Sequence, residues 1–141
     1  MGFEPGTFNV ADASRRGSPI TVLVVDDYAE MRGLIRVAFE LAEGFEVVAE
    51  AGSVDEALDA AGRTRPDAVV LDVLMPGRSP LDSLDDLAAA AGDPCAIVLL
   101  TALPDDAIAD LAAGLPPGFP VVSKAQLPIL PDVVTELCAN A

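Results

Sequence analysis

The sequence predicts an α/β protein with a doubly wound, five-stranded parallel sheet and helices on both faces. Five short apolar runs rich in β-branched residues lie along the chain, and longer stretches with helical spacing of apolar residues separate them. Strands that alternate with helices in this way are typical of parallel βαβ units. The chain has 141 residues, 52% of them hydrophobic. This is enough for one such domain, which we expect over residues 20–141.

The expected strands are the apolar runs at residues 20–25, 45–49, 68–71, 96–100 and 119–123. The first run does not alternate between apolar and polar residues, which suits a central strand covered on both faces. Pro120 in the last run predicts an edge strand, because proline cannot donate a hydrogen bond to a sheet. We therefore expect the flavodoxin-like strand order 2-1-3-4-5, which puts the first strand inside and the fifth at an edge.

The expected helices occupy residues 31–41, 53–62, 79–90, 105–113 and, from 127 or 131, the stretch to 139. Gly44 ends the first helix, and the pattern of Ser53 with Glu56 is a capping box that opens the second. Ser79 and Pro80 suit the N-cap and first turn of the third. Acidic residues in the first turn of the fourth favour a helix start there, because they complement the helix dipole.

Charge excludes several classes of partner. There are 23 acidic and 8 basic residues, a net charge of -15, which repels nucleic acids and anionic membranes. No apolar run approaches the roughly 18 residues needed to cross a bilayer. Residues 1–19 lack the apolar core of a secretory signal, so we expect a disordered leader. Cys95 and Cys138 are interpreted as buried or unreactive thiols in a reducing cytoplasm.

Ionisable and hydroxyl residues follow four of the expected strands, namely Asp26, Asp27, Asp72, Thr101 and Lys124. In such sheets ligands bind beyond the carboxyl ends of the strands, so these side chains should converge. Three carboxylates about 4 Å apart repel one another by roughly 4 kcal/mol per pair at an effective dielectric near 20. A hard cation removes that cost, and Mg²⁺ fits best because it accepts carboxylates while it keeps water and a phosphate oxygen as ligands.

Lys124 is the only lysine among the eight basic residues. At a strand end inside an acidic rim, it is placed to meet a phosphoryl oxygen as a point charge. Thr101 can donate a hydrogen bond to a second phosphoryl oxygen, and Asp72 remains as the nucleophile that forms an acyl phosphate. Each residue alone has a structural explanation, such as a helix cap, a loop acid or a solvated charge. The combination predicts a site for phosphoryl transfer.

Four sequence stretches resemble the receiver domain of bacterial response regulators in two-component signalling. They are residues 22–27, residues 66–77 with the pattern Asp-x-x-Met-Pro-Gly, residues 99–102, and Ser123 with Lys124. The resemblance extends over residues 20–139. It implies that Asp72 accepts a phosphoryl group from a phosphohistidine on a sensor histidine kinase or histidine phosphotransfer protein.

The resemblance also implies a role for each neighbouring residue. Asp27 would be a direct metal ligand together with Asp72, and Asp26 would hold metal-bound water. The backbone carbonyl of Leu74 would complete the metal shell. Thr101 would be the switch hydroxyl that moves towards the phosphoryl group, and Lys124 would pair with that group.

Three departures from the family pattern concern the output of the signal rather than its chemistry. Ser79 and Pro80 replace an Asp-Gly pair, Val121 stands where many receivers have an aromatic switch residue, and Ala125 replaces a proline after the lysine. One helix remains after Lys124, so we expect a stand-alone receiver that acts through a downstream protein or relays the phosphate. It could also form a homodimer.

Two other functions compete with this interpretation. A receiver-like binding module that does not need phosphorylation is the main alternative, favoured by Val121 and Pro80. An aspartyl phosphohydrolase is disfavoured, because the position two residues after the nucleophile is Leu74 rather than an acid. We expect no enzymatic activity beyond the chain's own phosphorylation and a slow dephosphorylation, since neither Leu74 nor Leu103 can position an attacking water.

Overall fold

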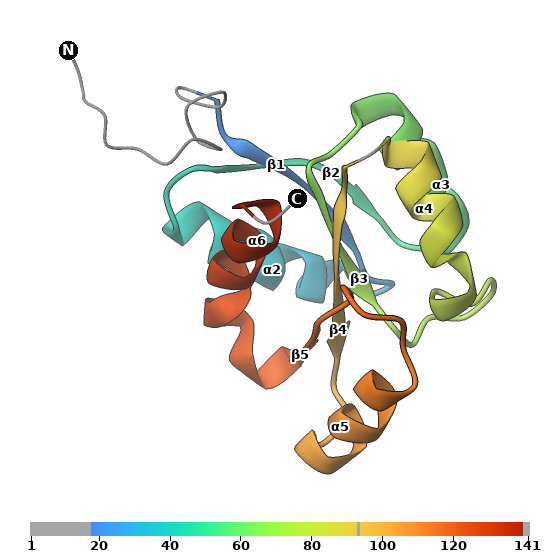
Figure 1. Ribbon diagram of the computed structural model, residues 1–141. Helices are drawn as coiled ribbons and strands as arrows, with labels where there is room; N and C mark the ends of the chain where they lie inside the picture. Colours follow the sequence, from blue (N-terminus) through green and yellow to red (C-terminus); the bar gives the residue numbers. More distant parts are fainter. Residues whose placement is uncertain (1–17, 93, 140–141) are drawn as a thin grey trace.

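The computed structural model describes residues 18–92 and 94–139, so the predicted leader lies outside the described residues except for its last two. Its five strands are β1 (Ile20–Val25), β2 (Phe45–Ala51), β3 (Ala68–Asp72), β4 (Ala96–Thr101) and β5 (Val121–Ser123). All neighbouring strands run parallel, in the order β2-β1-β3-β4-β5 (Figure 1). This confirms the predicted order, with β5 at an edge.

The helical segments are α2 (Ala29–Leu41), α3 (Val54–Thr64), η1 (Leu81–Ser83), α4 (Leu84–Ala91), α5 (Asp105–Ala113), η2 (Lys124–Ile129) and α6 (Leu130–Ala139), of which η1 and η2 are 3₁₀ helices. Helices α2 and α6 pack on one face of the sheet and α3 and α4 on the other (Figure 1). The prediction of helices on both faces is confirmed. None of the helices in residues 18–92 and 94–139 is long and apolar enough to span a membrane.

The core consists of two apolar layers separated by the sheet. Along β1, Val22 and Val24 pack towards α2 and α6, whereas Leu23 and Val25 pack towards α3 and α4, and all four are fully buried. This two-sided burial explains why the first apolar run shows no alternation. Each fully buried aliphatic side chain stabilises the fold by roughly 1.5–3 kcal/mol.

The third predicted helix begins later than the sequence suggested. Pro80 is followed by the 3₁₀ turn η1, and the α-helix starts only at Leu84. Ser83 has φ −115° and ψ 10°, outside helical values, and its hydroxyl donates a 2.7 Å hydrogen bond to the carbonyl of Ser79. That local bond competes with α-helical hydrogen bonding, so the first turn after Pro80 stays separate from α4.

Other boundaries also differ from prediction, and the structure gives a reason for three of them. β2 continues two residues further, because its last carbonyl, that of Ala51, accepts a 3.0 Å hydrogen bond from the Asp26 amide. α3 passes through Gly62 to Thr64 and is capped by Arg65, whose φ of 46° is left-handed. β5 starts after Pro120, whose carbonyl still accepts a 2.9 Å hydrogen bond from the amide of Leu99.

Candidate functional site

The predicted site residues lie at one edge of the sheet, where four parallel strands end. Asp72 closes β3 opposite Leu100, and Thr101 closes β4 opposite Ser123. Asp26 and Asp27 follow β1 directly, and Lys124 follows β5. The register of the strands therefore brings residues that are far apart in the sequence to the same edge.

The polar residue at each strand end is held by its own backbone. In each case a side-chain oxygen accepts a hydrogen bond from the amide two residues later, a local turn typical of Asp, Ser and Thr. These bonds join Tyr28 N to Asp26 Oδ1 (2.9 Å), Leu74 N to Asp72 Oδ1 (3.1 Å), Leu103 N to Thr101 Oγ1 (3.1 Å) and Ala125 N to Ser123 Oγ (3.1 Å). One oxygen of each of the two buried carboxylates is thereby fixed, and the other, Oδ2, is left to face the site.

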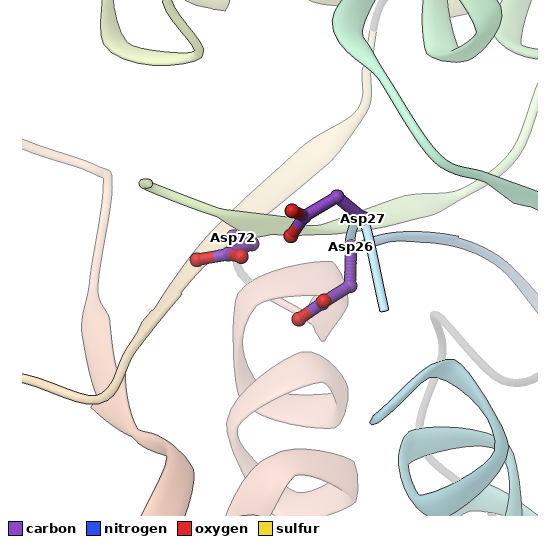
Figure 2. A group of neighbouring side chains, drawn as sticks. All are labelled: Asp26, Asp27 and Asp72. Atoms are coloured by element: carbon purple, nitrogen blue, oxygen red, sulfur yellow. The ribbon is translucent and has the colours of Figure 1, made fainter. Parts of the chain in front are cut away.

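Three carboxyl groups meet beyond the ends of β1 and β3 (Figure 2). One oxygen from each of Asp26, Asp27 and Asp72 lies within 4.8 Å of the others. Asp26 is fully buried and Asp72 is 3% exposed, whereas Asp27 is partly exposed. The buried Oδ2 of Asp26 faces the ammonium of Lys124 at 3.0 Å and has no other hydrogen-bond partner within the described residues. Three carboxylate oxygens this close together are the ligand type that a hard divalent cation prefers.

Lys124 bridges two of these carboxylates. Its Nζ lies 3.0 Å from Asp26 Oδ2 and 3.3 Å from Asp72 Oδ2, and its side chain is only 15% exposed. Burial by itself lowers the pKa of this ammonium, but the attraction of Asp26 and Asp72 outweighs it and leaves the pKa above its usual value. Lys124 is therefore a fixed positive charge at physiological pH.

The pKa of Asp72 is raised, and desolvation by burial is the largest cause. The neighbouring charge of Asp26 raises it further, whereas the Leu74 amide and Lys124 lower it. A carboxylate in this setting is poorly solvated. A positive charge brought to the cluster should therefore favour its ionised form.

Thr101 lies at the edge of the site, and within the described residues no hydrogen bond joins it to Asp72 or Lys124. Its side chain is fully buried, and its hydroxyl oxygen accepts a hydrogen bond from Leu103. The hydroxyl proton is not used in that bond, so it can be donated to another group. The structure therefore brings the carboxylates and Lys124 into contact and places Thr101 on the adjacent strand.

An arginine pair beside the site was not predicted from the sequence. Arg32 donates a 2.8 Å hydrogen bond to the carbonyl of Asp26 and a 3.1 Å bond to Glu50, and Arg36 pairs with the same carboxylate. The hydrogen bond from Arg36 is the main cause that lowers the pKa of Glu50, despite an opposing effect of burial. The sequence shows two arginines at positions i and i+4 of a helix, but it does not show that Glu50 on β2 is their partner, because tertiary packing brings the two elements together. This cluster supports the loop that carries Asp26.

Comparison with known proteins identifies the family. The family model for the response regulator receiver domain matches residues 22–116, which is more than half of the chain. The chain therefore belongs to the response regulator receiver domain family. The matched stretch includes the three aspartates and Thr101, while Lys124 lies beyond it.

Curated relatives point the same way. A probable transcriptional regulatory protein, TcrX of Mycobacterium tuberculosis, is 44% identical over 72% of this chain and 42% of its own length. The nitrate/nitrite response regulator NarP of Escherichia coli is 42% identical over 68% of this chain and 43% of its length. The chain thus spans less than half of these relatives.

The similarity to solved structures covers more of the chain than the residues 22–116 that the family model matches. A LuxR-family two-component response regulator from Aurantimonas sp. SI85-9A1 has a TM-score of 0.72 and 26% identity, and the similarity covers 87% of each chain. The receiver domain of a putative NarL from Mycobacterium tuberculosis has a TM-score of 0.63 and 25% identity, over 87% of this chain and 98% of that one. The response regulator domain of Thermotoga maritima CheB, at 22% identity and a TM-score of 0.67, shares the fold.

Proposed function

We propose that this receiver accepts a phosphoryl group on Asp72 from a phosphohistidine of a sensor histidine kinase or histidine phosphotransfer protein. The observation that carries the proposal is the position of Lys124, whose Nζ lies 3.0 Å from Asp26 and 3.3 Å from Asp72 beside three clustered carboxylates. A buried carboxylate with one fixed cation is the arrangement that a carboxylate nucleophile needs for transfer of a phosphoryl group.

Asp72 is the nucleophile in this proposal. The hydrogen bond from Leu74 fixes its Oδ1, so the chain presents Oδ2 to the phosphorus atom. The new bond joins this oxygen to phosphorus as the bond between phosphorus and the donor nitrogen breaks. Lys124 then pairs with a phosphoryl oxygen, and Thr101 donates its free hydroxyl proton to another.

The metal of this site is proposed to be Mg²⁺. Asp27 and Asp72 would supply carboxylate oxygens, the backbone carbonyl of Leu74 would be a further ligand, and Asp26 would hold metal-bound water. When bound, Mg²⁺ supplies positive charge for the oxygens of the transferring phosphoryl group. The cluster itself, with oxygens within 4.8 Å of one another, supports this assignment.

Exposed apolar side chains beside the site support a protein as the phosphodonor. Tyr28, the residue after Asp27, is 65% exposed, and Leu74, two residues after Asp72, is 64% exposed. Leu34, farther along α2, is 55% exposed. Large apolar side chains exposed around a reactive group are typical of surfaces that bind another protein. With a sensor histidine kinase or histidine phosphotransfer protein as donor, the proposed location of the chain is the cytoplasm.

Phosphorylation would change the interaction with a downstream protein or pass the phosphate onward. The competing function, a binding module that does not use phosphate, does not explain why Lys124 lies buried between Asp26 and Asp72. Since a lysine buried among carboxylates costs desolvation energy, the phosphoacceptor function is favoured.

The test uses the single tyrosine of a chain that has no tryptophan. Tyr28 follows Asp27 directly, so its fluorescence should report events at the cluster. Addition of Mg²⁺ and then beryllofluoride, a phosphoryl mimic, should change the emission of the wild type in two saturable steps. Asp72→Ala should lose the beryllofluoride step, and Asp110→Asn, a substitution on α5, should keep both. No beryllofluoride response in the wild type would favour the phosphate-independent module.

A further inference from the structure

A second surface, away from the carboxylate cluster, has the features of a docking groove. It has a volume of about 480 Å³ and lies between η1 and α4 on one side and α5 with its following segment on the other (Figure 1 labels α4 and α5). This volume falls within the range of about 300–1,000 Å³ that is typical of binding pockets.

The interior of the groove is apolar. Its lining includes five large apolar side chains, Leu81, Leu84, Leu111, Leu115 and Phe119. Four of these are only partly buried where they pack against the core, and Leu84 is 6% exposed. Helix α5, which forms one wall, has no buried residue. The groove therefore leaves apolar surface accessible that the fold itself does not cover.

The rim of the groove is acidic. Asp82 and Asp85 lie on one side and Asp110 on the other. All three are exposed, and in the described ranges none of them forms an ion pair. The nearby Asp86, by contrast, is paired with Arg78. Three unpaired carboxylates around an apolar floor select for a positively charged partner.

The charge of the chain excludes two classes of occupant. A second copy would bring 23 acidic and only 8 basic residues towards an acidic rim. Among the described residues its Lys124 is held by Asp26 and Asp72, and Arg32, Arg36, Arg63 and Arg78 are paired, which leaves only Arg65 to face three rim carboxylates. Nucleic acid would be repelled by the same rim. A basic protein segment with apolar side chains satisfies both the floor and the rim.

We propose that the groove between α4 and α5 binds a basic amphipathic segment of a partner protein. Its apolar side chains enter between Leu81 and Leu115, and its lysines or arginines face Asp82, Asp85 and Asp110. This binding goes beyond the phosphoacceptor function, because it uses neither Asp72 nor a metal.

The test uses the full chain and a synthetic helical peptide of about 15 residues, long enough to form several turns. The peptide carries leucines on one face and lysines on the other, and a scrambled peptide of the same composition is the control. Fluorescence anisotropy of the labelled peptides measures affinity. Amide chemical shifts of the ¹⁵N-labelled chain locate the contact. The amphipathic peptide should bind more tightly than the scrambled one and shift residues 81–91 and 105–119.

Two charge-matched variants separate the groove from general electrostatics. Asp82→Asn, Asp85→Asn and Asp110→Asn combined should weaken the amphipathic peptide about tenfold. Three other exposed acids, Glu40, Glu43 and Glu46, changed together to glutamine, remove the same charge elsewhere and should weaken it less than about twofold. Equal losses in both variants, equal binding of the scrambled peptide, or shifts outside the groove would overturn the proposal.

Discussion

Replacement of Asp27 by asparagine should stabilise the fold when no metal is present. One oxygen of Asp27 lies within 4.8 Å of oxygens from both Asp26 and Asp72. Two unit charges at that distance repel by about 0.9 kcal/mol in water and about 3.5 kcal/mol at an effective dielectric of 20. Because Asp27 is partly exposed and Lys124 offsets its two neighbours, the relief should lie near the lower figure. We expect the free energy of unfolding to rise by about 1 kcal/mol.

The assay is urea denaturation followed by circular dichroism, in EDTA and again in about 10 mM MgCl₂. A ligand that binds only the folded state at ten times its Kd adds about 1.4 kcal/mol. The wild type should gain stability of that order from Mg²⁺, and Asp27→Asn should gain much less because it has lost a proposed ligand. Asp110→Asn removes an exposed, unpaired charge on α5 and should leave both values almost unchanged. An Asp27→Asn protein that is less stable than the wild type in EDTA, or that gains as much from Mg²⁺, would refute this account of the cluster.

Three further predictions address other parts of the molecule. Burial raises the pKa of the Cys95 thiol from 9.0 to about 12. The thiol of the unfolded chain therefore loses its proton at a lower pH than that of the folded chain. The free energy of unfolding should fall as the pH rises from about 9 towards 12, and it should fall less steeply in Cys95→Ala. Identical pH profiles of the two proteins in urea denaturation would contradict this. The hydrogen bond from Arg36 lowers the pKa of Glu50 below 4.5, so its stabilisation is present above that pH and lost as the pH falls through the lowered pKa. Glu50→Gln should cost roughly 0.5–1 kcal/mol at neutral pH and flatten the acid limb of the stability profile; an unchanged acid limb would count against the Arg36 contact. The acyl phosphate on Asp72 should persist in Mg²⁺, because Leu74 and Leu103 cannot orient an attacking water. Its loss is measured by intact mass, and a loss as fast as in rapidly cycling chemotaxis regulators would argue against this.

The strand order and the proximity of the site residues could be predicted because they depend on local patterns and a general topological rule. The continuous apolar run of β1 indicated two-sided burial, and Pro120 indicated an edge strand. Once the order is set, parallel strands deliver their following residues to one edge. Asp26, Asp72 and Lys124 therefore meet although they are far apart in the sequence.

Features that depend on side-chain packing were not predictable. The late start of α4 depends on the hydrogen bond between Ser83 and Ser79, which competes with a helix that the Ser79-Pro80 pattern favours. The bond from Arg32 to the carbonyl of Asp26 depends on how α2 lies against β2. The acidic groove between α4 and α5 likewise arises only when the two helices are placed.

Phosphoryl transfer to Asp72 is tested most directly by the intact mass of the chain after incubation with Mg²⁺ and a small phosphodonor such as acetyl phosphate. The wild type should gain one phosphoryl group, located on Asp72 by peptide fragmentation. Asp72→Asn should gain none, and Lys124→Gln should gain it more slowly. An unchanged wild-type mass, or equal phosphorylation of Asp72→Asn, would show that Asp72 is not the phosphoacceptor.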